Sequence, residues 1–142
     1  AVAKVERFVA LADVVRASDS DLEWLYPQRS VEETAAAWLE LGPAMVVATY
    51  GSRGPWGLVA SGTARAAAPL VDVADTVGAG DSFISAMISA LADRELLGSG
   101  QREKLHKLDT GTLEEILDYA ARAAAITVSR AGANPPFREE IR

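Results

Sequence analysis

The chain has 142 residues, of which 49% are hydrophobic and 24% charged, and its formal net charge is −6. This length suits one domain or a large piece of a longer protein, and the hydrophobic content is sufficient for a real core. The acidic balance argues against a nucleic-acid partner, and no apolar run approaches the roughly 20 residues that cross a membrane, so we expect neither partner. With no cysteine and one histidine, any chemistry must depend on carboxylates, hydroxyls, backbone amides and a hard cation.

Helix and strand periodicities alternate along the chain. Short apolar runs indicate strands, and apolar residues three and four positions apart indicate helices. Serine or threonine followed three residues later by an acidic residue marks a helix start, and glycine or proline marks an end. On these signals we expect a strand over 12–17, helices over 18–27 and 30–41, strands over 45–50 and 56–60, an extended segment over 66–73, a helix over 80–97, a polar, mobile loop over 98–111, and a helix over 112–129.

This order of elements predicts a layered α/β unit, because strands alternate with helices and hairpin-like strands then precede two helices. Thr112 with Glu115 is a candidate capping box for the last helix. His106 falls in the polar loop, where no catalytic role is expected. Apolar surroundings place three aromatic residues in the core or its packing: Trp24, Trp38 and Trp56.

The strongest local signal is the string 75–83, in which Gly78 and Gly80 flank an alanine and Asp81 follows. Two glycines permit a tight turn where an extended segment enters a helix, and the first free amides of that helix then point outward with the positive end of its dipole. Such a turn can bind an anion. Asp81 either faces the bound group or simply caps the helix, although capping does not explain the small residues around it.

This string resembles the carboxy-terminal signature of the ribokinase-like sugar kinases, the PfkB family. The resemblance implies that Gly78, Ala79 and Gly80 form an anion hole for the transferring phosphate and that Asp81 is the base that takes the sugar hydroxyl proton. Phosphoryl transfer depends mainly on positioning and charge stabilisation, which amides at a helix start provide. The family further implies ATP and Mg²⁺ as cofactors, a sugar substrate and a cytoplasmic enzyme.

A second motif, Thr-x-Gly-x-x-Gly, is formed by Thr49, Gly51 and Gly54 at the end of an expected strand. It is neither a Rossmann fingerprint nor a Walker loop, and taken alone the pattern is weak evidence, for which a simple loop is the more common explanation. The same kinases, however, keep a nucleotide-contacting loop at this distance before the aspartate. The resemblance therefore implies that these three residues, with Gly80 and Asp81, contact the nucleotide.

The stretch 17–25 resembles the segment in which the family places an Asn-x-x-Glu motif that organises magnesium through water. Ser18 and Asp21 occupy the two positions here, and both depart from that pattern, although several fructokinase-like members carry serine at the first. A capping box formed by the same pair is the structural alternative. Either residue can serve both purposes.

A monovalent cation site is also implied near the carboxyl end. In the family, the segment after the last helix closes over the adenine side and, with the loop before the glycine-rich turn, offers carbonyl oxygens to a cation such as K⁺. Pro136 stands where a hydroxyl residue is common, so the sequence departs from the pattern there. The matching positions, mostly through backbone oxygens, are Asp75, Val77, Thr127, Arg130 and Gly132.

The resemblance covers nearly the whole chain but corresponds only to the carboxy-terminal half of a sugar kinase, and the fructokinase branch is the most similar. We therefore expect residues 1–142 to form a single unit, the carboxy-terminal portion of a ribokinase-like α/β/α layered sheet, without the half that grips the sugar. An unpaired sheet edge would then need a complementary chain or a homodimer partner as cover. Two alternatives to a sugar kinase stay open: a nucleotide-binding fragment without turnover, and a structural domain whose Gly-Ala-Gly-Asp is only a helix cap.

Overall fold

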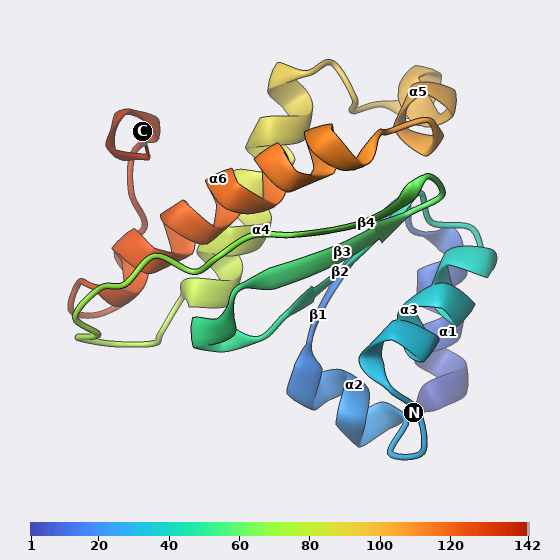
Figure 1. Cartoon of the computed structure of the whole chain (residues 1–142), viewed down its shortest axis with the longest axis horizontal. Coiled ribbons are helices and arrows are strands. Elements are labelled where there is room, and N and C mark those ends of the chain that lie inside the picture. Colours follow the sequence, from blue (N-terminus) through green and yellow to red (C-terminus); the bar gives the residue numbers. More distant parts are fainter. Residues whose placement is uncertain (142) are drawn as a thin grey trace.

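The computed structural model describes residues 1–141 and arranges them as a four-stranded sheet between two layers of helices (Figure 1). β1 and β2 run parallel, whereas β2, β3 and β4 are antiparallel neighbours, so that β1 and β4 form the edges. This is the layered α/β/α fold that the sequence predicts. The strands are β1 (Val14–Ser18), β2 (Met45–Thr49), β3 (Pro55–Val59) and β4 (Gly62–Arg65).

The helices divide between the two faces of the sheet (Figure 1). One face carries α1 (Val2–Leu11), α2 (Asp19–Leu25) and α3 (Val31–Glu40), and the other carries α4 (Ala79–Asp93) and α6 (Thr110–Val128). A short helix, α5 (Arg102–His106), lies between α4 and α6 in the chain. Among residues 1–141, no helix is both long and apolar enough to cross a membrane.

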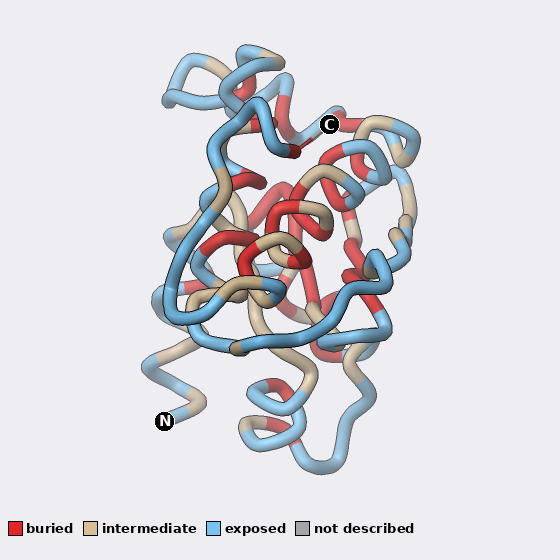
Figure 2. The backbone as a smooth tube through the Cα atoms, turned by 90° about the vertical axis from the view of Figure 1, so that its left-hand side faces the viewer, coloured by how far each residue is buried: buried red, intermediate tan, exposed pale blue. Residues whose placement is uncertain are grey.

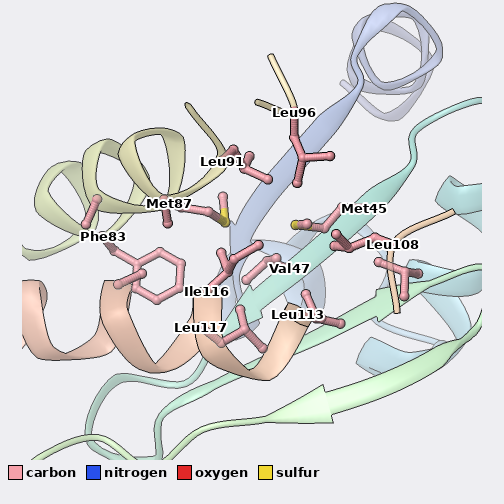
Figure 3. Close-up of a cluster of buried hydrophobic side chains, with 14 of the residues drawn as sticks. Met45, Val47, Phe83, Met87, Leu91, Leu96, Leu108, Leu113, Ile116 and Leu117 are labelled. Atoms are coloured by element: carbon pink, nitrogen blue, oxygen red, sulfur yellow. The ribbon is translucent and has the colours of Figure 1, made fainter. Parts of the chain in front are cut away.

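The central strand β2 explains why both helical layers are needed. Successive side chains of a strand point to opposite faces, and four successive residues of β2, 45–48, are fully buried. Val46 and Ala48 belong to the core beneath α1, α2 and α3, together with Trp38 and Trp56. Figure 3 shows the opposite core, in which Met45 and Val47 of β2 meet Phe83, Met87 and Leu91 of α4 and Leu113, Ile116 and Leu117 of α6.

The two cores concentrate the buried residues in the middle of the molecule, whereas the segment before the carboxyl terminus is mostly exposed (Figure 2). α4 and α6 form the most extensive helix pair. Small side chains at their contact, Ala86, Ala90, Ala120 and Ala123, are buried and allow the two helices to approach closely. This pair holds the start of α4 in place.

Side-chain caps begin three of the helices. Ser18 caps α2 and Ser30 caps α3, each accepting a hydrogen bond from the backbone amide three residues later, as predicted. The predicted box of Thr112 with Glu115 is wrong. α6 begins earlier because the Asp109 carboxylate accepts a 2.6 Å hydrogen bond from the Thr112 amide, and aspartate is among the best N-cap residues.

The sequence analysis missed α1. Val2, Val5 and Val9 lie on one face at helical spacing, and they pack against the core under α3. Because this apolar stripe is narrow and no side-chain cap precedes it, the amino-terminal segment gives little local signal for a helix.

The extended segment predicted over 66–73 forms no strand; the fourth strand is β4, directly before it. The Ala66 amide donates to the Pro55 carbonyl at 3.2 Å, and sheet pairing ends there. Pro69 has no amide to donate, and Leu70 is fully exposed, so neither ladder bonds nor burial extend the strand.

Two boundaries near the end of α4 also differ from prediction. The helix ends at Asp93, because Glu95 takes a left-handed backbone with φ of 56°. The predicted loop over 98–111 contains α5, whose Leu105 is buried, so this segment contributes to the core. The ring nitrogens of His106 lie within hydrogen-bonding distance of the Arg102 and Gly42 carbonyls, which is a packing role.

The tryptophan prediction holds for two of the three residues. Trp38 and Trp56 are buried, and the Trp38 indole donates a 3.0 Å hydrogen bond to the Tyr26 hydroxyl. Trp24 is 74% exposed on α2, so its assignment to the core is wrong. Leu22 fills the buried position of that short helix instead.

The cap of α6 predicts an acid-dependent loss of stability. Hydrogen bonds from Thr112, above all from its backbone amide, hold the pKa of Asp109 below its ordinary value of 3.8. The stabilisation is therefore complete above pH 3.8 and is lost as the pH falls through the lowered folded-state pKa. Asn is also a good N-cap but does not titrate. The melting temperature of the Asp109→Asn variant should therefore fall less on acidification than that of the wild type. An equal fall in melting temperature for the two proteins would contradict this role of Asp109.

Candidate active site

The start of α4 is an open helix terminus. Gly78 is the N-cap residue, Asp81 lies in the first turn, and no side chain caps the helix. The Ser82 amide donates the first helical hydrogen bond, to the Gly78 carbonyl at 2.9 Å. The preceding amides of Gly80 and Asp81 have no partner within the part of the chain that the structure describes. The predicted helix start is confirmed, and its free donors face outward as an anion site requires.

Glycine is required at position 78 for two reasons. Its φ of +82° is a left-handed conformation that side chains disfavour. A methyl group there would also lie 3.3 Å from the Ala133 Cβ and 3.7 Å from the Thr127 Cγ2. The segment that follows α6 therefore supports the glycine-rich turn from behind.

A pair of hydroxyl groups ties this turn to α6. Ser82 and Thr127 are both buried, and their side-chain oxygens are hydrogen-bonded. Thr127 Oγ1 donates to the Ala123 carbonyl at 3.1 Å, so the Ser82 hydroxyl is the donor to Thr127. The first turn of α4 is thus fixed from its buried side, and its outward side is left open.

The Asp81 side chain lies on that open side. It is exposed and takes part in no hydrogen bond or ion pair with residues 1–141. A capping role would require its carboxylate to accept a hydrogen bond from the first turn, as Ser18, Ser30 and Asp109 do in their helices. Charge compensation of the helix dipole is the one structural role that its position supports.

The Thr49–Gly54 loop begins at the carboxyl ends of the two parallel strands. Thr49 ends β2 and pairs with Ser18 at the end of β1. In open α/β sheets this end of parallel strands is where ligands bind. Burial is the largest of the causes that raise the pKa of Tyr50, the next residue, whose ring lies 5.0 Å from the Arg53 guanidinium.

The two glycines of this loop differ in their surroundings. Gly54 has a φ of +83°, and a methyl group there would lie 2.2 Å from the Ala66 carbonyl oxygen. Its requirement for glycine is therefore explained by the close approach of the chain after β4. Gly51 faces open space, which leaves it accessible to a ligand.

Arg16 joins the two motifs, and the sequence analysis missed it. Its Nη2 donates to the Thr49 hydroxyl at 2.7 Å. A methyl group on Gly80 would lie 2.9 Å from Arg16 Nη1, so the guanidinium packs against the glycine-rich turn. Thr49 and Gly80 thus both contact the Arg16 side chain. The available signal was one arginine inside the apolar strand β1.

The capping alternative for Ser18 and Asp21 is confirmed. Ser18 Oγ accepts from the Asp21 amide at 3.1 Å, and Asp21 Oδ2 accepts from the Ser18 amide at 3.4 Å. Asp21 Oδ1 has no hydrogen bond within residues 1–141 and is free to reach a hydrated ion. In the same residues, no group of three His, Cys, Asp or Glu side chains lies close enough together to hold a metal ion.

Of the residues predicted to bind a monovalent cation, Thr127 is buried in the last turn of α6, and the others lie in the segments before α4 and after α6. Asp75 Oδ1 accepts from the Val77 amide at 2.9 Å, and Asp75 Oδ2 accepts from the Gly132 amide at 3.1 Å. The Arg130 side chain turns away to pair with Glu140. The side-chain oxygens of Asp75 and Thr127 are thus already hydrogen-bonded within the protein, which leaves the predicted role of their backbone carbonyls untouched.

Two hollows lie elsewhere along α4 and α6. The larger, about 290 Å³, lies between the carboxyl end of α4 and the middle of α6 and includes Arg94, Glu115 and Arg122. The other, about 140 Å³, is lined by Ser82, Tyr119 and residues of the carboxyl-terminal segment. Neither contains the Thr49–Gly54 loop or the Gly78–Gly80 turn. The candidate site is therefore identified by its chemical groups and not by a deep cavity, because free amides and unpaired charged side chains lie together at the start of α4.

An open glycine-rich helix start at the carboxyl ends of parallel strands, next to an unpaired aspartate, is the arrangement of a phosphate-handling α/β protein. Residues 1–140 match the model of the pfkB family of carbohydrate kinases, and the chain belongs to this family. The resemblance stated from the sequence is thereby confirmed.

Individual relatives agree with this family. The fructokinase of Rhizobium leguminosarum bv. trifolii is 36% identical over 100 residues, which cover 70% of this chain and 31% of the relative. An aminoimidazole riboside kinase from Salmonella enterica, complexed with its riboside and an ATP analogue, superposes with a TM-score of 0.77 at 25% identity over 99% of this chain and 44% of its own. A double mutant of the Vibrio cholerae O395 fructokinase, bound to fructose, ADP and a potassium ion, superposes with a TM-score of 0.75 at 26% identity, over 93% of this chain and 39% of its own. The chain thus spans less than half the length of these relatives.

Replacement of Gly78 tests the construction of the turn. Gly78→Ala should lower the free energy of unfolding by about 1–2 kcal/mol, because alanine is strained at this φ. Gly100→Ala is the matched control, since Gly100 has open space around it and no positive φ, and it should change stability by less than about 0.5 kcal/mol. Urea unfolding of both variants measures the difference, and equal stabilities would contradict the assigned backbone constraint.

Proposed function

We propose that this chain is the nucleotide-binding and catalytic portion of an ATP-dependent sugar kinase. The observation that carries the proposal is the open start of α4, where the free amides of Gly80 and Asp81 lie beside an exposed, unpaired carboxylate. Membership of a carbohydrate kinase family supports the reaction class. Fructokinase relatives support a hexose or a similar sugar as the acceptor.

In this proposal the terminal phosphates of ATP bind at the Gly78–Gly80 turn. The Thr49–Gly54 loop lies next to that turn through Arg16, so the nucleotide occupies the surface between the two motifs, with its base toward α6. Gly51 and the Thr49 hydroxyl are the contacts available from the loop. The nucleotides bound by the Salmonella and Vibrio relatives support this assignment.

The chemical step is an in-line phosphoryl transfer. Asp81 accepts the proton of a sugar hydroxyl, the hydroxyl oxygen forms a bond to the γ-phosphorus, and the bond from that phosphorus to the β-phosphate oxygen breaks to release ADP. Backbone amides at the start of α4 stabilise the charge on the transferred group without rearranging. Mg²⁺, held by the nucleotide phosphates and through water by Asp21, would supply further neutralisation of phosphate charge.

A monovalent cation completes the proposed cofactor set. The Asp75 side chain links the segment before the glycine-rich turn to the segment after α6, because it accepts hydrogen bonds from the Val77 and Gly132 amides, and this supports a cation site between the two segments. A K⁺ ion there would hold the turn in position, as Gly78 rests on the segment after Thr127. The potassium ion of the Vibrio relative supports the choice of ion.

We further propose that the sugar-binding portion lies outside these residues, in a longer chain or in a partner. β1 is an edge strand whose residues are all partly exposed, and Phe8, Leu11 and Trp24 are large exposed apolar side chains on the neighbouring helices. A complementary segment or a second copy would cover this side. The family's use of ATP supports a cytoplasmic location.

Two alternatives make different predictions. A nucleotide-binding fragment would bind ATP or ADP but would phosphorylate no sugar even when a complementary half is supplied. A structural domain would bind neither nucleotide. The open start of α4 disfavours the structural alternative, because Asp81 makes none of the hydrogen bonds that a cap requires.

The Asp81→Asn variant tests the general base. It should be assayed in enzyme that contains this chain and the complementary sugar-binding half. Asparagine keeps the shape of the side chain but cannot accept the proton, so turnover should fall by roughly 10²-fold or more while nucleotide affinity and melting temperature change little.

Asp72→Asn is the matched control, because Asp72 is also exposed and lies outside the helices. Its turnover should equal that of the wild type. Near-wild-type turnover of Asp81→Asn would remove Asp81 from the mechanism. A wild type that binds no nucleotide at millimolar concentration would reject the proposed function itself.

A further inference from the structure

Arg16 is a cation held where the local field is already positive. Its guanidinium packs against Gly80, the second residue of α4, at the end of the helix that carries the positive pole of the dipole. Cations are favoured at the opposite end of a helix. Placing one here lowers stability unless another group supplies negative charge.

Within residues 1–141, no carboxylate forms an ion pair with Arg16, and Asp81, the acidic residue in the first turn of α4, makes no contact with it that would neutralise its charge. Arg53, Arg94 and Arg102 each form an ion pair with a carboxylate, but Arg16 has no such partner within residues 1–141. Its one side-chain hydrogen bond goes to the neutral hydroxyl of Thr49. Its Nε is buried without a partner, so the charge is partly withdrawn from water. A desolvated cation without a counter-ion is costly.

The surroundings of Arg16 hold the guanidinium in one orientation. β1 fixes its backbone, the Thr49 hydroxyl accepts from Nη2 at 2.7 Å, and the missing side chain of Gly80 leaves the space that Nη1 occupies. A guanidinium presents its donors in a planar fork that matches two phosphate oxygens, and a pre-oriented fork loses less entropy on binding. The arrangement is suited to an anion that also contacts the amides of Gly80 and Asp81.

We propose that Arg16 is a catalytic residue that binds the terminal phosphates of the nucleotide and stabilises the charge on the transferred phosphoryl group. This inference rests on the proposed function and adds a residue to its site. Arg16 and the amides at the start of α4 contact the same group from two sides, which explains why two positive features are adjacent. An arginine supplied within the chain is a known way to stabilise charge in phosphoryl transfer.

The test is the dependence of binding on phosphate number. ATP, ADP and AMP are titrated calorimetrically into the wild type, Arg16→Gln and Arg16→Lys. Loss of one charged, bidentate contact should weaken ATP binding by roughly 10- to 100-fold in Arg16→Gln, with a smaller loss for ADP and less than about 2-fold for AMP. Arg16→Lys keeps the charge but not the fork, and its ATP affinity should lie between the two.

Arg94→Gln is the matched control, because Arg94 lies at the other end of α4, and its nucleotide affinities should equal those of the wild type. Equal losses for all three nucleotides, or unchanged ATP binding, in Arg16→Gln would show that Arg16 only ties β1 to α4 and would overturn the proposal. If Arg16→Gln does not fold, Arg16→Lys decides by the same comparison. A wild type that binds none of the three nucleotides would reject the proposed function as well.

Discussion

The left-handed backbone of Gly78 is the constraint on which the site depends. It turns the chain into α4 without using a side-chain cap, and so leaves the first amides of that helix free. The turn stays in place because Ser82 and Thr127 bond in the interior behind it and Ala133 packs against Gly78. An open helix start normally binds water or fluctuates; here the close packing of α4 and α6 holds it in one orientation.

Three elements meet at this point; two of them contribute positive potential, and the third orients the arginine. Helix α4 contributes its amides, β1 contributes Arg16, and β2 contributes the Thr49 hydroxyl that orients the arginine. The acidic chain as a whole repels phosphates, with a net charge of −6, so this local concentration of donors must compensate for the average field. The exposed carboxylate of Asp81 lies in the same turn, so the proposed proton acceptor is adjacent to the proposed phosphate donors.

The sequence was sufficient to predict the layered fold and the position of the α4 start, because glycine spacing, caps and apolar periodicity are local signals. It was insufficient where tertiary contacts decide the outcome. The sequence of residues 66–73 is typical of an extended segment, yet a strand needs a neighbour with free backbone groups. The position beside β3 is occupied by β4, so these residues form no strand. Arg16 read as part of a strand, since its role depends on contacts with Thr49 and Gly80, which are distant in the sequence. Trp24 read as core because composition cannot show which face of a short helix is covered.

The most direct measurement of the central claim, that the start of α4 binds nucleotide phosphate, is an amide-resolved NMR titration of the protein with ATP. The account predicts that the largest shifts fall on the backbone amides of residues 79–81 and on the Arg16 side chain, with smaller shifts in the Thr49–Gly54 loop. A competing anion site would be the hollow between the carboxyl end of α4 and the middle of α6, which Arg94 and Arg122 line. Shifts concentrated in that hollow, with residues 79–81 unmoved, would contradict the account.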